Sequence, residues 1–233
     1  VPSVLLGKRR INVVQEVVTG YSAASIAQQK KHYKYFEDLQ AEYKYVKNQQ
    51  GKSPDGKNEF VLVNNYTELE KAMKKKIAYI GIVTIEGAHV FGTGAPETDA
   101  VSKQELIKRL TQNIHTVKNW EHPPFIINLS HHFWNHLAGH AKSFKRPINN
   151  IVNQNKGKNK GITEAGWHVI RELLSTQNGK RILIDTKHMS IASRKEYYEF
   201  VGNHNYINPN HKIPIISSHA CANGYKTMDS SIK

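Results

Sequence analysis

The sequence predicts an α/β fold in which parallel strands alternate with helices. The main evidence is a set of short, unalternated apolar runs rich in β-branched residues, a pattern typical of strands buried on both faces. These runs lie at 77–85, 125–130, 181–185 and 212–218. Helix-forming segments separate them, and parallel strands need crossover connections of this kind.

The connecting segments carry helix start signals. Ser102-Lys-Gln-Glu105 has the pattern of a capping box, and Ser190 is a suitable cap for a helix that starts at Ile191. Between them, residues 163–176 form another helical segment that ends near Gly179. The predicted order of the central part is therefore strand, helix, strand, helix, strand, helix, strand.

The first part of the chain is predicted to lead into this alternation. Residues 22–48 are the longest helical candidate, with apolar residues at spacings of three, four and seven. A short strand is expected at 60–63. Thr67-Glu-Leu-Glu70 has the capping-box pattern and predicts a helix that ends in the lysines of 74–76.

Composition disfavours several classes of protein. The chain has 33 Lys and Arg against 19 Asp and Glu, but the lysines are scattered, so nucleic acid is not expected as a partner. No uninterrupted apolar stretch reaches the roughly 18 residues of a membrane span. The single Cys221 excludes an internal disulfide. The compartment and the oligomeric state, a homo-oligomer included, stay open.

Polar groups follow the ends of the predicted strands: Glu86, His131, His188 and His219. Because parallel strands have their carboxyl ends at one edge, we expect His188 and His219 to emerge side by side. One histidine at a strand end is more often structural, but two at equivalent ends favour a metal site. A carboxylate directly after a buried strand also needs a partner or a metal.

A weaker alternative involves His132, His136 and His140. Their spacing of four would put all three on one face of a helix, which is compatible with zinc binding. The glutamate of a metalloprotease helix is missing, so a separate site here is disfavoured.

Five segments together resemble a known family: Ile85–His89, Asn128–His131, Gly161–Leu173, Leu183–Ser190 and Pro214–Ala220. In this order they resemble the membrane dipeptidase (renal dipeptidase) family of the amidohydrolase superfamily, from about Tyr66 to Ala220. The resemblance implies a (β/α)8 TIM-barrel-like fold, of which this chain covers about the middle strands. The expected organisation is one incomplete barrel domain over 1–233, with a helical lead-in over 1–58 and barrel strands and helices over 59–220.

The resemblance also implies roles for individual residues. Glu86 would bridge two zinc ions in the complete protein, and His188 and His219 would complete one metal. His131 would orient the scissile group, and Lys212 would take the place of an arginine that binds the substrate carboxylate. The implied activity is hydrolysis of a dipeptide or similar small amide by a metal-activated water.

The sequence departs from the family pattern in three respects. It contains no His-x-Asp, which supplies two further metal ligands in the family, and no late-strand aspartate. Lys212 keeps the charge of an arginine but lacks its bidentate fork. The alternative is therefore a non-catalytic or degenerate dipeptidase-like binding protein with a remnant metal site.

Overall fold

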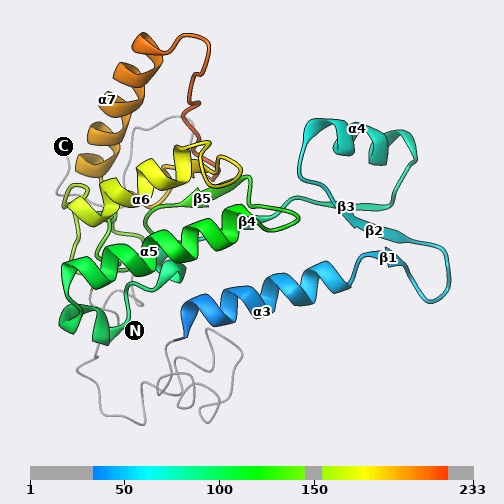
Figure 1. Ribbon diagram of the computed structural model, residues 1–233, viewed down its shortest axis with the longest axis horizontal. Helices are drawn as coiled ribbons and strands as arrows, with labels where there is room; N and C mark the ends of the chain where they lie inside the picture. The colour runs from blue at the N-terminus through cyan, green and yellow to red at the C-terminus, as the bar shows by residue number, and fades with distance from the viewer. Residues whose placement is uncertain (1–33, 145–153, 220–233) are drawn as a thin grey trace.

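The computed structural model describes residues 34–144 and 154–219 of the chain. Within these residues the protein is a mixed α/β structure with two separate three-stranded sheets. Figure 1 shows a larger part, which contains one sheet and the helices packed beside it, and a smaller part built on the other sheet. The alternation of strands and helices agrees with the predicted order. These sheets neither form nor exclude a closed barrel, so the barrel remains a prediction.

The larger sheet consists of β4 (Thr84–Ile85), β5 (Ile126–Asn128) and β6 (Leu183–Asp185). Its strands are parallel and pair in the order β4-β5-β6. An isolated parallel bridge between Asp185 and Ile216 extends this order by one more segment. The predicted strand at 212–218 is thus reduced to a single bridge. All four segments nevertheless present their carboxyl ends at the same edge.

Helices connect and follow these strands: α5 (Lys103–Lys118), α6 (Glu164–Leu174) and α7 (Ile191–Ile207). The predicted starts are confirmed, because the side chains of Ser102, Thr163 and Ser190 each accept a hydrogen bond from a first-turn amide. Two short 3-10 helices, η1 (Ala88–Phe91) and η2 (Pro96–Ala100), fill the connection between β4 and α5. Within the described ranges, no helix has the length and apolarity needed to cross a membrane.

One apolar core lies between the larger sheet and its helices. The inward face of α5 contributes Leu110, Ile114 and Val117, which are fully buried. They join Ile127 of β5 and Ile184 of β6 in the same cluster. The strands are apolar on both faces because they lie inside this core, as the sequence pattern indicated.

The smaller part contains α3 (Tyr35–Asn48), β1 (Gly51–Lys52), β2 (Glu59–Leu62), α4 (Tyr66–Lys74) and β3 (Tyr79–Gly81). β1 pairs antiparallel with β2, and β2 pairs parallel with β3. In Figure 1, α3 runs from beside the larger part towards this sheet. The helix has no buried residue, but Tyr43 stacks on Trp120 with ring centroids 4.0 Å apart.

Two predicted elements differ in the structure, and a third lies partly outside the described residues. The run 77–85 is not one strand, because Gly81 bonds to the smaller sheet while Val83 accepts from Phe125 of the larger one. Helix α4 is capped by Asn65 and not by Thr67, since the Asn65 side chain accepts from the Glu68 amide. For the helix predicted over 22–48, the part from 22 to 33 lies outside the described residues.

A buried lysine closes the carboxyl end of α6. Lys118 is 1% exposed, and its ammonium group donates to the carbonyls of Glu172, Ser175 and Gln177 at 2.7, 2.8 and 2.9 Å. These carbonyls lie at or after the last turn of the helix, where backbone acceptors lack helical partners. Burial lowers the pKa of Lys118, although Glu172 opposes this effect.

Replacing this lysine should therefore destabilise the fold. We expect Lys118→Met to lower the free energy of unfolding by about 2–4 kcal/mol, because three carbonyls at the carboxyl end of α6 lose a charged donor. Lys108→Met, on an exposed position of the same helix, is the control and should change stability little. Urea unfolding followed by circular dichroism measures both. Equal stability of the two variants would contradict this role of Lys118.

Candidate metal centre

The four residues predicted from the strand ends come together in the structure. Glu86 directly follows β4, and His131 lies three residues after the end of β5. His188 lies three residues after the end of β6, and His219 three residues after the bridge at Ile216. Parallel pairing places these positions at one edge, so side chains up to 133 residues apart in the chain meet there (86 to 219).

Glu86 Oε1 is the centre of this cluster. It lies 3.2 Å from His188 Nε2, 3.4 Å from His131 Nε2 and 3.7 Å from His219 Nε2. The Nε2 atoms of His188 and His219 are themselves 3.2 Å apart. Three ring nitrogens therefore face one carboxylate oxygen.

These separations fit a single metal ion. Ligand atoms held about 2.0–2.1 Å from zinc in a tetrahedron lie about 3.3 Å from one another. The three edges of the Glu86, His188 and His219 group are 3.2, 3.2 and 3.7 Å, which matches this value without a large rearrangement. Oxygen and imidazole donors in this combination suit zinc and other first-row metals, so the donor set alone does not select zinc.

A second possible ligand group consists of His131, His132 and His188, whose ligand atoms lie within 4.8 Å of one another. The rings of His131 and His132 have centroids 4.0 Å apart, and both rings approach His188. His188 belongs to both groups. Because one imidazole nitrogen binds one ion, the two groups compete for His188 and offer a complete set to one metal at a time.

His188 has an unusual backbone conformation that points its ring into the cluster. Its φ is +65°, which non-glycine residues rarely adopt. The backbone of the residue is held by Ala141, whose amide donates to the His188 carbonyl at 2.8 Å. The side chain is 7% exposed, the least of the groups that contact Glu86. A strained conformation at the centre of a cluster is typical of functional sites.

A buried carboxylate orients His219 through a serine. Asp185 is fully buried, and it accepts hydrogen bonds from the Ser218 hydroxyl and, at 3.2 Å, from the Ser218 amide. The same hydroxyl is 2.8 Å from His219 Nδ1. With Nδ1 engaged, Nε2 is the nitrogen left to face Glu86. Partners of this kind fix the tautomer and direction of a metal-binding histidine.

His132 is positioned in a similar way, although the sequence analysis considered it only in a disfavoured alternative site. Its Nδ1 lies 2.7 Å from Ser143 Oγ, and Gln154 Nε2 donates to the His132 carbonyl at 2.8 Å. Its only sequence signal was its position directly after His131 at the end of a strand.

His132, His136 and His140 do not share a helix face, because residues 131–144 contain no helix, which removes the alternative site that the sequence already disfavoured. His140 is fully buried, with its two ring nitrogens 3.0 Å from the carbonyls of Ala141 and Lys156. His136 has a φ of +62° and lies 3.6 Å from Asp99. Backbone carbonyls thus surround the ring of His140, and a carboxylate lies beside that of His136.

The protonation states of the cluster favour cation binding. Burial, and then the neighbouring histidines, lower the pKa of His132 and of His188 to about 4. Burial also lowers the pKa of His131, although Glu86 opposes it. Partial burial would raise the pKa of Glu86, but the three histidines outweigh it and the pKa lies below its usual value. At neutral pH the rings of His131, His132 and His188 are thus neutral, and the Glu86 carboxylate is charged.

An aromatic pocket opens beside His131. Its volume is about 140 Å³, and its walls come from Tyr35, His89, Gly94, His131, Phe133, Trp134 and Asn135. This volume is below the roughly 300–1,000 Å³ of pockets for drug-sized ligands, and it suits a single side chain. Burial lowers the pKa of His89 to about 4, so this ring is neutral as well.

Lys212 is not part of this arrangement. It is exposed and precedes Ile213, whose amide donates at 2.7 Å to Asn205 near the end of α7. The segment 212–218 runs parallel to β6. Lys212 therefore lies at the amino end of this segment, whereas the cluster lies at its carboxyl end. The prediction that Lys212 binds a substrate carboxylate is therefore not supported by its position. Lys187 is closer, because its ammonium donates to the His219 carbonyl.

A scan against protein-family models and a search of the curated proteins found no match for this chain.

The link from Asp185 to His219 can be tested by removing the Ser218 hydroxyl group. We expect Ser218→Ala to weaken zinc binding by about 10-fold, because the hydroxyl no longer orients the His219 ring. Ser217→Ala, an exposed neighbour, is the matched control and should leave the affinity unchanged. Competition with a chromogenic chelator measures both affinities. If both variants bind zinc like the wild type, the serine does not position the ligand.

The lowered histidine pKa values predict how the stability of the metal-free protein depends on pH. His188 has a pKa of about 4 in the folded protein and about 6.5 when unfolded, so below pH 6.5 protons bind the unfolded chain first. Its contribution to stability is present above pH 6.5 and is lost as the pH falls towards 4. We would measure the free energy of unfolding of the wild type and of His188→Gln in the presence of a chelator. Between pH 6.5 and pH 4, the wild type should lose stability relative to the variant as the pH falls. The loss should be at most about 1.4 kcal/mol per pH unit. A pH-independent difference would contradict the assignment.

Proposed function

We propose that this protein is a metal-dependent hydrolase that cleaves a dipeptide or a similar small amide. The observation that carries the proposal is the convergence of Glu86, His131, His188 and His219 from four parallel segments. This arrangement lies at the carboxyl edge of the strands, where α/β enzymes place their chemistry. The resemblance to the membrane dipeptidase family, seen in the same residues, supports the same reaction.

Glu86, His188 and His219 would hold the ion, which we propose to be zinc. When bound, zinc supplies a water of lowered pKa and polarises the amide carbonyl. A further residue of the site, His131, would act on the substrate directly. His131 is 26% exposed and 3.4 Å from Glu86, so its neutral ring is placed to hydrogen-bond the scissile group. It is our candidate catalytic residue.

The aromatic pocket beside His131 provides a place for a substrate side chain. Tyr35, Phe133 and Trp134 make it predominantly aromatic, and its volume is about 140 Å³. An apolar side chain next to the scissile amide would bury its surface there while the amide lies against His131. We therefore expect substrates with a leucine- or phenylalanine-like group beside the cleaved bond.

A second candidate function is metal-dependent binding without catalysis. Two observations favour it: both ligand groups in the described residues use His188, and the sequence has no His-x-Asp. A protein of this kind would hold one ion and recognise a ligand without cleaving it.

Metal analysis and hydrolysis assays separate the two candidates. We expect about one zinc per chain by elemental analysis, together with release of amino acid from leucine- or phenylalanine-containing dipeptides. Glu86→Gln should weaken zinc binding by about 10-fold or more, because the carboxylate directly contacts the ion. His131→Ala should retain zinc and lower turnover by about 100-fold or more, the usual cost of removing one hydrogen bond to the reacting group. His211→Ala, an exposed histidine outside the cluster, is the control.

One zinc per chain without turnover would support the binding protein. Protein that takes up no zinc, or a Glu86→Gln variant that keeps the full affinity, would exclude both candidates.

A further inference from the structure

A lysine reaches the cluster around Glu86 from the turn after β6. Lys187 directly precedes His188 in the chain, and its ammonium group donates a hydrogen bond to the backbone carbonyl of His219. Both histidines are proposed ligands of the ion. Only the length of the His219 residue separates the ammonium group from the ring nitrogen that faces Glu86. Lys187 therefore places a positive charge at the rim of the site.

The hydrogen bond to His219 leaves most of this ammonium group available. A lysine ammonium has three N–H donors, and the His219 carbonyl accepts from one of them. Within residues 34–144 and 154–219, the Lys187 ammonium makes no other hydrogen bond and no ion pair. The residue is only partly buried, so its remaining donors are open to a ligand that lies at the rim.

The charges around the site leave one positive charge unbalanced when a divalent cation is bound. In the described part of the chain, the carboxylates that contact the cluster or Lys187 are those of Glu86 and Asp185. They balance the two charges of the ion, because imidazoles bind metals in their neutral form. The charge of Lys187 is then the excess, and a single carboxylate of a substrate would balance it.

The aromatic pocket lies on the opposite side of the cluster. Its walls include His89, in the helix η1 after β4, and His131, after β5. Lys187 follows β6, and His219 follows the segment that bridges to β6. Because the strands pair in the order β4-β5-β6, the pocket and the ammonium group flank the cluster from opposite sides. The ring centroids of His131 and His219 lie 4.8 and 5.1 Å from that of His188, which stands between them.

A dipeptide has a suitable length to reach both sides of the cluster. Two extended residues span about 7 Å, and the side chain of one residue extends this reach further. With the amide at the ion, the side chain in the pocket and the carboxylate at Lys187 belong to different residues. Since the carboxylate is that of the carboxyl-terminal residue, the side chain in the pocket is that of the amino-terminal residue.

We propose that Lys187 determines specificity by binding the free carboxylate of a dipeptide whose amino-terminal side chain occupies the aromatic pocket. The preferred substrates then have leucine or phenylalanine as the first residue and a free carboxyl group on the second. Lys187 thereby takes the role that the resemblance implied for Lys212, but from the carboxyl end of the strands. This inference rests on the proposed function, because it assumes that the amide lies at the ion.

Leu-Gly and Leu-Gly amide test the carboxylate contact, because the amide lacks only the negative charge. The zinc-loaded full chain should release leucine from Leu-Gly with a kcat/KM about 10-fold higher than from Leu-Gly amide, mainly through KM. Lys187→Met should remove this preference, and Lys187→Arg should restore most of it. Lys212→Met, an exposed lysine at the other end of segment 212–218, is the matched control and should keep it. The preference is a ratio within each variant, so a partial loss of folded protein does not change it.

Gly-Leu tests the orientation of the substrate. We expect Leu-Gly to be cleaved with a kcat/KM about 10-fold higher than Gly-Leu, because only Leu-Gly buries its leucine side chain in the pocket. Equal values, or a preference for Gly-Leu, would overturn this orientation.

Binding measurements separate a failure of this inference from a failure of the proposed function. If the wild type cleaves none of the peptides, the hydrolase is excluded, and calorimetric titration of the zinc-loaded protein with Leu-Gly and Leu-Gly amide tests Lys187 alone. A preference for Leu-Gly that is lost in Lys187→Met supports the same contact in a binding protein. A preference that survives in Lys187→Met assigns the carboxylate to the ion or to another residue and overturns the inference. Equal affinity of the wild type for both peptides also overturns it.

Discussion

The buried carboxylate of Asp185 holds together the strand ends on which the metal cluster depends. It accepts hydrogen bonds from the Asn128 amide group and from the backbone of Lys187, both at 3.0 Å, and from Ser218. These donors come from β5, from the turn after β6 and from the last described segment. A buried carboxylate without them would cost several kcal/mol, so donors and acceptor are required together. These hydrogen bonds hold the segments that carry His131, His188 and His219 next to one another at the same edge of the sheet.

The cluster combines ordinary topology with local features that oppose stability. Parallel pairing alone brings the four strand ends to one edge, but it does not select the side-chain directions. His188 adopts a positive φ, and several imidazoles are crowded around one carboxylate. Such conformations cost of order 1–3 kcal/mol each and persist where the surrounding structure over-determines them. Departures from local preference are expected where side chains are arranged for binding rather than for stability.

The elements with local signals were predictable from the sequence. Ser102 and Ser190 begin helices, because a short polar side chain caps the first turn irrespective of the rest of the fold. Glu86, His188 and His219 were found because each follows a recognisable apolar run, and parallel strands end at a common edge. For these residues a local pattern and one topological rule were sufficient.

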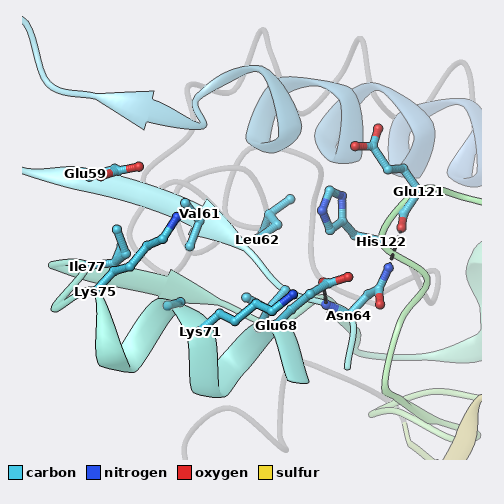
Figure 2. A pocket seen from close by; sticks show the side chains of 12 residues that line it. Glu59, Val61, Leu62, Asn64, Glu68, Lys71, Lys75, Ile77, Glu121 and His122 are labelled. Atoms are coloured by element: carbon cyan, nitrogen blue, oxygen red, sulfur yellow. Dashed lines mark hydrogen bonds between the residues drawn. The ribbon is translucent and has the colours of Figure 1, made fainter. Parts of the chain in front are cut away.

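The rest depends on contacts that no local pattern encodes. His132 reaches the cluster through a loop whose path is set by buried bonds, such as that from Ser130 Oγ to the Gly139 carbonyl at 3.1 Å. Lys212 was assigned to the site by resemblance, while its strand position places it at the other end of the segment. A cavity of about 340 Å³ at His122 joins residues from both parts of the molecule (Figure 2), and nothing in the spacing of Lys71, Lys75 and His122 predicts that they share it.

The division of the apolar run 77–85 between two sheets has a mechanical consequence. Only Ile82 and Val83 separate β3 from β4, and both neighbours of this pair are hydrogen-bonded into their own sheets. Two residues span at most about 7 Å, so a displacement of the smaller sheet that would exceed this reach is transmitted to β4. Glu86 is the next residue after that strand. The chain thus forms a short, nearly inextensible tether between the sheet that lines one cavity and the carboxylate at the centre of the cluster.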